Sequence, residues 1–108
     1  MLDTVFHALS DPTRRMILAH LAKGEATVDE ISAPFAMSQP SISRHLKVLE
    51  QAGLISTRID GTARPRRIKA DAFLAIEAWM NEYRAVWDAN YARLDTVLEN
   101  LKREDDLT

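Results

Sequence analysis

Apolar residues in the first part of the chain recur at the spacing of one helical face. This spacing predicts a first helix from Leu2 to Leu9. Asp11 and Pro12 then predict the start of a second helix, because aspartate is a good cap and proline lacks an N–H that the first turn leaves unpaired. The buried face of this second helix is predicted to consist of Met16, Ile17, Leu18 and Leu21.

A shorter helix is predicted next. Thr27 and Glu30 match a capping box, in which the side chain of each residue bonds the backbone N–H of the other. Ile31 and Phe35 are expected to point inward from this helix, and Met37, just beyond it, is expected to contact the core.

A further helix is predicted over residues 38–52, with Ser38 as its cap and Gly53 just beyond its end. Only residues 36–38 separate it from the short helix before it, which is the spacing of a helix-turn-helix. In that motif the second helix enters the major groove of DNA, so residues 38–52 are predicted to be a recognition helix. Its buried face is predicted to be Ile42, Leu46 and Leu49.

The periodicity changes from helical to alternating beyond the recognition helix. Residues 55–59 alternate in the manner of a strand, Asp60-Gly61 is a turn signal, and residues 66–69 can return as the partner strand. Pro65 cannot donate to a strand ladder, so it is expected at the start of the second strand or on an exposed edge. We therefore predict a hairpin, or wing, over residues 54–69; the alternative is a solvated basic hairpin with no ligand.

One long helix is predicted over residues 71–103, with Asp71 as its cap. About 30 helical residues span roughly 45 Å, more than one small domain can cover, so we predict a two-fold homodimer. The alternative is a helix that breaks near Asn81 or Asn90 and folds back over its own core. The positions of this helix that are predicted to meet the second copy are Ile76, Met80, Tyr83, Trp87, Asn90, Leu94, Val97 and Leu101.

Charge is unevenly distributed along this chain of 108 residues, whose formal net charge is −2. Residues 1–37 and 70–108 carry net charges of −2 and −5, whereas residues 38–69 carry +5. A concentrated basic zone is typical of a phosphate-binding surface, and this zone coincides with the predicted recognition helix and wing. The alternative is a charged face that only contacts solvent.

The outer face of the predicted recognition helix carries residue types that read base edges. Gln39 can pair with adenine and Arg44 with guanine, and no acid occurs between Ser38 and Val48. His45 either touches DNA or packs beneath the helix. We predict base reading by Gln39, Ser41, Ser43 and Arg44, and phosphate contacts by Ser38, Lys47, Arg64, Arg66 and Arg67.

Several of these stretches together resemble one family of bacterial regulators. A-L-S-D-P-T-R-R-M-I-L at residues 8–18 and S-Q-P-S-I-S-R-H-L-K-V-L-E-Q-A-G-L-I at residues 38–55 are similar to ArsR-type winged-helix repressors. A-R-P-R-R-I at residues 63–68, W-x-x-x-Y-x-x-x-W at 79–87 and R-L-D at 93–95 resemble a metal-independent subgroup. The resemblance implies a homodimer built from the first and last helices, which binds a palindromic operator in or near its own promoter. It thereby adds Leu2, Val5 and Phe6 of the first helix to the predicted dimer interface.

The chain departs from the metal-sensing members of that family. It has no cysteine, so the stretch at residues 28–33 lacks the Cys-x-Cys of those members. His7, His20 and His45 are scattered over three predicted helices and form no evident tetrahedral set. We therefore predict no metal site and no cofactor, and the effector stays open.

Composition is that of an ordinary globular protein, with 46% apolar and 28% charged residues. The chain is predicted to be one winged helix-turn-helix domain over residues 1–108, mainly α with a small β-hairpin. It shows no membrane span and no signal peptide, so a cytoplasmic location is expected. It also shows no nucleophile–base set or phosphate loop, so no enzyme activity is expected.

We predict a sequence-specific regulator that binds double-stranded DNA, most simply a homodimeric repressor; the alternatives are an activator and a winged-helix protein-interaction adaptor.

Overall fold

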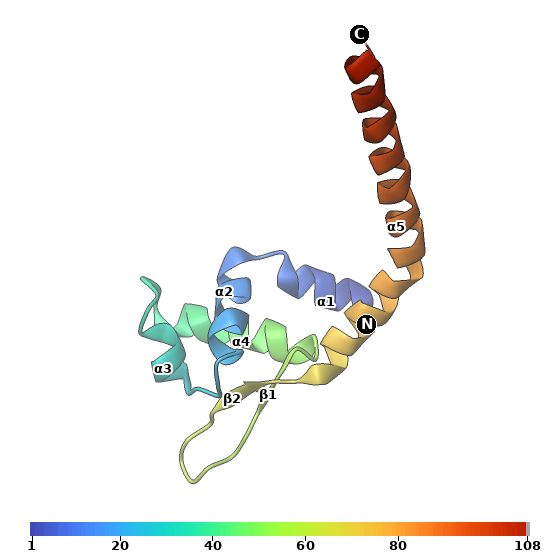
Figure 1. Cartoon of the computed structure of the whole chain (residues 1–108). Helices are drawn as coiled ribbons and strands as arrows, with labels where there is room; N and C mark the ends of the chain where they lie inside the picture. Colours follow the sequence, from blue (N-terminus) through green and yellow to red (C-terminus); the bar gives the residue numbers. More distant parts are fainter. Residues whose placement is uncertain (108) are drawn as a thin grey trace. The chain divides into compact units, whose positions relative to one another are not determined.

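The computed structural model describes the backbone of residues 1–107 and the side chains of residues 1–105. The chain divides into two compact units, residues 1–76 and the residues from 77 onward. The predicted combination of helices with one antiparallel hairpin is confirmed. The elements, labelled in Figure 1, are α1 (Leu2–Leu9), α2 (Pro12–Leu21), α3 (Val28–Ser32), α4 (Gln39–Gln51), β1 (Ile55–Thr57), β2 (Arg66–Ile68) and α5 (Ala70–Leu107).

Side-chain caps set the starts of α2, α3 and α4. Asp11 accepts two N–H groups of the first turn of α2, at 2.8 and 3.2 Å. Thr27 and Glu30 form the complete capping box at the start of α3, and the Ser38 hydroxyl accepts an N–H of α4 at 3.3 Å. The predicted caps of these three helices are confirmed, and each depends on residues that are close together in the sequence.

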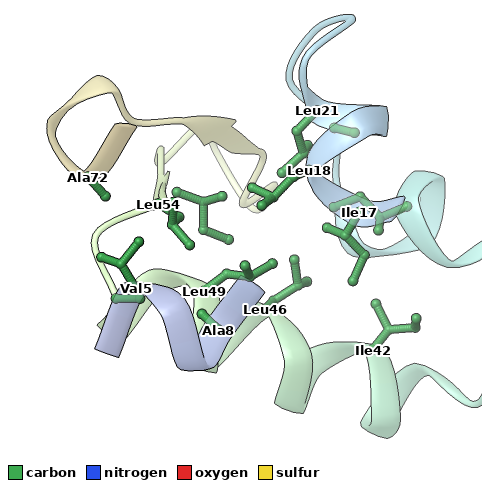
Figure 2. Packing of buried hydrophobic residues seen from close by; sticks show 14 residues of the cluster. Val5, Ala8, Ile17, Leu18, Leu21, Ile42, Leu46, Leu49, Leu54 and Ala72 are labelled. Carbon is green, nitrogen blue, oxygen red and sulfur yellow. The ribbon is translucent and has the colours of Figure 1, made fainter. Parts of the chain in front are cut away.

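The core of the 1–76 unit forms where α1, α2, α3 and α4 pack against each other and against the start of the hairpin. The predicted buried face of α4 is confirmed, and so is the burial of Ile31 on α3. Phe35 is half-buried against the same core. Figure 2 shows the packing of Val5 and Ala8 of α1, Ile17, Leu18 and Leu21 of α2, Ile42, Leu46 and Leu49 of α4, and Leu54 and Ala72.

The buried face of α2 differs from the prediction at one position. Met16 is 59% exposed, whereas Arg14 is only 8% exposed. Neighbouring helical residues are rotated by about 100°, so three successive residues cannot share one narrow face. Positions 14, 17, 18 and 21 have the spacing of a single buried stripe, and arginine occupies its first position.

Met37 is also exposed, contrary to the prediction. It lies in the turn between α3 and α4, where its sulfur is 3.9 Å from the Thr13 hydroxyl. A turn of this kind runs over the surface, so an apolar residue within it need not reach the core.

The hairpin is shorter than predicted, since β1 ends at Thr57 and Ile59 lies beyond it in an exposed position. Arg58 donates its N–H to the Pro65 carbonyl at 2.9 Å, but proline has no N–H to donate in return. The ladder therefore stops there. Pro65 directly precedes β2, which is one of its two predicted positions, and it is buried. The register pairs Ile55 with Ile68, Ser56 with Arg67 and Thr57 with Arg66.

Two further backbone pairings complete the wing. Asp60 and Ala63 exchange hydrogen bonds of 3.1 and 2.9 Å across the predicted turn, in which Gly61 adopts a φ of +62° that favours glycine. On the other edge of β2, Ala26 exchanges hydrogen bonds of 2.7 and 3.0 Å with Arg66. The segment before α3 is thereby attached to the hairpin.

The last helix, α5, begins at Ala70 and is continuous to Leu107, through both Asn81 and Asn90. The alternative of a break at either asparagine is therefore wrong. Asp71 lies within the first turn rather than at the cap, 3.8 Å from the Lys69 ammonium. Within the described part of the chain, no helix is long and apolar enough to cross a membrane.

Candidate nucleic-acid interface

The recognition helix α4 has two chemically distinct faces. Its apolar residues are buried in the core, which leaves the opposite face to solvent. Of the predicted base-reading residues, Gln39, Ser43 and Arg44 are exposed, while Ser41 is half-buried. Lys47, predicted to bind phosphate, is exposed one turn further along. The helix thus presents amide, hydroxyl and guanidinium groups on one surface, as base reading requires.

Ser41 links Ser38 to Arg44. The Ser38 hydroxyl donates to the Ser41 hydroxyl at 3.0 Å, and Arg44 Nη2 donates to the same Ser41 oxygen at 3.1 Å. The Ser41 hydroxyl therefore orients the Arg44 guanidinium. A guanidinium has five N–H donors, so this contact leaves others for the edge of a guanine.

Gln39 is held by an acid from the preceding helix. Its amide Nε2 donates to Oδ1 of Asp29, which lies in the first turn of α3. The interpretation of the sequence missed Asp29, because only the packing of α3 against α4 brings the two residues together. A carboxylate therefore lies beside the start of a helix that has no acid of its own between Ser38 and Val48.

The three wing arginines differ in their contacts. Arg64 donates to the carbonyls of Gly61 and Ala63, both at 2.9 Å, and is exposed. Arg67 is also exposed, with Nε donating to the Ser56 hydroxyl at 3.3 Å.

Arg66 lies between Arg64 and Arg67 in the sequence, and unlike them it is half-buried. Its Nη1 donates to the Arg64 carbonyl at 2.7 Å, and its Nε is buried without a hydrogen-bond partner among the described residues. Arg64 and Arg67 are therefore better placed than Arg66 to meet an external phosphate.

Two cations of the basic zone are paired with acids. Arg58 lies 2.5 Å from Glu25 and 3.8 Å from Asp60, and Lys69 pairs with Asp71. The hydrogen bond from Arg58 holds the pKa of Glu25 below its usual value, and the same contact raises the pKa of Arg58. Among the residues that the structure describes, Arg44, Lys47, Arg64, Arg66 and Arg67 form no ion pair.

Arg14 is a second residue that the interpretation of the sequence missed. From its buried position on α2 it donates to the carbonyls of His7 and Ala8 and contacts His45 of α4. His45 is half-buried, which agrees with the alternative that it packs beneath the recognition helix. The signal for Arg14 was present in the helical spacing of the buried positions, which places it in line with three apolar residues.

Comparisons with known proteins identify the family. Residues 11–57 match the description "Bacterial regulatory protein, arsR family". The chain is 48% identical over 60 residues to the transcriptional repressor SdpR of Bacillus subtilis (strain 168), a match that covers 56% of this chain and 67% of SdpR. It is 42% identical to the crystal structure of the ArsR family transcriptional regulator RHA00566, with a TM-score of 0.74 over 81% of this chain and 90% of the other. The chain belongs to the arsR family.

The fold of this ArsR-family chain is confirmed by a further solved structure. The homodimeric winged helix-turn-helix DNA-binding domain Mb0332 from Mycobacterium bovis is 29% identical, with a TM-score of 0.62 over 77% of this chain and 80% of that domain. Members of the family are DNA-binding transcriptional regulators, so the prediction that the chain is a regulator and not an enzyme is confirmed.

The predicted dimer residues of the ArsR-family chain fall into two groups. In the 1–76 unit, Val5 is fully buried within its own chain and offers no surface to a second one, so its inclusion was wrong. Leu2 and Ile76 are half-buried, and Phe6 is exposed. From residue 77 onward the predicted positions are all exposed, namely Met80, Tyr83, Trp87, Asn90, Leu94, Val97 and Leu101.

Potential metal ligands are dispersed in the part of the ArsR-family chain that the structure describes. Among the side chains of residues 1–105, no three His, Cys, Asp or Glu residues lie close enough together to hold a metal ion. Asp29 instead accepts a hydrogen bond from Gln39, and Glu25 forms an ion pair with Arg58.

Proposed function

We propose that this ArsR-family chain is a homodimeric repressor that reads a palindromic operator in double-stranded DNA. The observation that carries the proposal is the exposed face of α4, which holds Gln39, Ser43, Arg44 and Lys47 with no acid between Ser38 and Val48. The acid of this helix, Glu50, lies near its C-terminal end and accepts a hydrogen bond from Thr57 at 3.0 Å. Bidentate side chains on one helical face suit the donor and acceptor pattern of the major groove. Gln39, Ser41, Ser43 and Arg44 read bases in this proposal.

Phosphate contacts position the helix without carrying sequence information. Arg64 and Arg67 of the wing and Lys47 of α4 are exposed cations without acidic partners among the described residues, so they suit this role. Ser38 lies at the start of α4, where the N-terminus of the helix attracts a backbone phosphate. Arg66 contributes less, because its guanidinium is half-buried.

Dimerisation is proposed from the exposed apolar side chains of α5. Ten large apolar residues between Trp79 and Leu101 are each at least 40% exposed, an unusual density for a surface without a partner. The rings of Trp79 and Tyr83 pack tilted to each other and those of Trp87 and Tyr91 meet edge to face, with ring centroids 5.2 and 5.1 Å apart. A second copy would cover these side chains, and the homodimeric state of Mb0332 supports that occupant. Two recognition helices would then meet half-sites roughly 34 Å apart.

Repression by this dimer is proposed to need no metal. The chain has no cysteine to supply thiolate ligands, and the described residues offer no cluster of three other donors. We expect DNA affinity to be the same after dialysis against a chelator and after addition of zinc. A reproducible loss of affinity on zinc addition, reversed by the chelator, would contradict this part of the proposal.

Selection of bound duplexes from a random DNA pool tests the central claim. We expect an enriched sequence with two inverted half-sites about one helical turn apart. Sedimentation of the same protein measures its oligomeric state. Failure to enrich any duplex at low ionic strength, or enrichment of a single unrepeated half-site by a monomer, would refute the proposal.

A further inference from the structure

An acid outside the recognition helix contacts one of the proposed base-reading side chains. Asp29 occupies the first turn of α3, whose start is fixed by the Thr27–Glu30 capping box and whose Ile31 is fully buried. The backbone that carries Asp29 is therefore well anchored. From this position Asp29 Oδ1 accepts a hydrogen bond from Nε2 of Gln39.

The donor and the acceptor of this hydrogen bond cannot exchange roles. An ionised carboxylate can only accept hydrogen bonds, whereas a glutamine amide has an accepting oxygen at one end and a donating nitrogen at the other. Rotation of the amide by 180° would present its oxygen to Asp29, which would bring two acceptors together. Asp29 thus selects one of the two amide orientations of Gln39.

We propose that Asp29 determines DNA sequence preference by fixing the amide of Gln39. The inference rests on the proposed function, because it assigns a second residue to the same reading surface. A glutamine reads adenine with its oxygen accepting from N6 and one N–H donating to N7. One of the two N–H groups of Gln39 donates to Asp29, and the other N–H, together with the amide oxygen, remains available for the adenine edge.

The negative charge of Asp29 has a second consequence. Asp29 is exposed beside the face of α4 that meets DNA in the proposed complex, so its carboxylate repels the phosphate backbone. Asp29 therefore raises selectivity while it lowers affinity for DNA of any sequence. A residue with a purely structural role would not move these two quantities in opposite directions.

The substitution Asp29→Asn separates this role from a steric one. Asparagine has the same shape, but its amide both donates and accepts, so it can pair with Gln39 in either orientation. We expect the variant to lose about tenfold in discrimination at one base pair of each half-site, within the range of a bidentate contact. Its affinity for non-specific DNA is expected to rise. Circular dichroism and urea unfolding check whether the variant folds.

Two further variants complete the experiment. Glu25→Gln removes the same charge at a residue that contacts Arg58 rather than Gln39, so its sequence preference is expected to match that of the wild type. Gln39→Ala is expected to erase preference at the base pair affected by Asp29→Asn. Asp29→Asn is then expected to cause no further change of preference in the Gln39→Ala background.

The outcomes distinguish a failure of this inference from a failure of the proposed function on which it rests. A wild-type protein that selects no sequence refutes the proposed function. A selective wild-type protein whose Asp29→Asn variant keeps the same preference overturns the inference alone. A change of preference that persists in the Gln39→Ala background also overturns it, because Asp29 would then act through another residue.

Discussion

Arg14 of α2 and His45 of α4 are in direct contact, with 3.2 Å between the guanidinium Nη1 and the imidazole Nδ1. Arginine can only donate, so a hydrogen bond between the two side chains requires Nδ1 of His45 to be the acceptor. The same guanidinium donates to the carbonyls of Ala8 and His7 at 2.6 and 3.1 Å. One buried side chain therefore joins the end of α1 to the recognition helix.

Replacement of Arg14 by methionine is expected to destabilise the fold. The substitution preserves much of the apolar contact but removes the donor to the buried Ala8 carbonyl, which costs about 1–3 kcal/mol of unfolding free energy, whereas the His7 carbonyl still accepts from Ser10. Urea unfolding followed by circular dichroism measures the change. Arg15→Met is the matched control, because Arg15 is exposed and makes one hydrogen bond, to the Leu9 carbonyl at 2.8 Å. Equal losses in the two variants would contradict the importance of the Arg14 contacts.

Arg44→Ala is expected to reduce affinity for the selected operator by about 1–3 kcal/mol and to relax preference at one base pair. The physical reason is loss of a bidentate donor that Ser41 orients. Binding to the operator and to single-base variants of it measures both effects. Lys47→Ala serves as a control, because loss of its proposed phosphate contact is expected to weaken binding to all sequences similarly. An unchanged preference profile for Arg44→Ala would remove Arg44 from the reading set.

Arg67→Ala is expected to weaken binding to every sequence alike. Each phosphate contact contributes about 0.9 to the slope of log affinity against log salt, so a dimer that loses two contacts loses roughly 1.8. Titrations at several salt concentrations measure the slope. Arg66→Ala is expected to change it less, because the Arg66 guanidinium is half-buried. A sequence-selective loss in Arg67→Ala would argue against a phosphate contact.

A chain truncated after Ala85 is expected to be monomeric. The truncation removes the exposed apolar residues from Val86 to Leu101, which we propose a second copy covers. Analytical ultracentrifugation measures the molecular mass. A chain that ends at Arg103 retains those residues and is expected to dimerise like the full chain. A stable dimer of the shorter chain would show that α5 is not the main interface.

The cap of α2 predicts a pH dependence of stability. Backbone hydrogen bonds from Arg14 and Thr13 hold the pKa of Asp11 below its ordinary value. A depressed folded pKa means that Asp11 stabilises the fold above its unfolded pKa, about 3.9, and that this contribution is lost as the pH falls through the folded pKa.

Asp11→Asn keeps a good capping group but cannot titrate. Urea unfolding between pH 7 and pH 2.5 compares the variant with the wild type. We expect any advantage of the wild type at neutral pH to shrink below about pH 4. A constant difference across that range would mean that the charge of Asp11 is irrelevant to folding.

Most of the fold follows from local patterns. The three caps, the buried face of α4 and the turn at Asp60 were predicted because each depends on residues within a few positions of one another. Met16 is exposed although it is apolar, because the angle around α2, and not hydrophobicity, sets which residues face the core. β1 was predicted too long, because the effect of Pro65 on the opposite strand depends on register.

The sequence by itself determined where the helices and the hairpin lie, which side of α4 is buried and where the basic residues gather. Only the tertiary structure decided the partners of the functional side chains. Asp29 meets Gln39, Arg14 meets His45 and Glu25 meets Arg58 across 10, 31 and 33 positions of sequence. Periodicity reports which face of an element is buried, whereas such polar pairs depend on how separate elements pack, and no local pattern encodes that geometry.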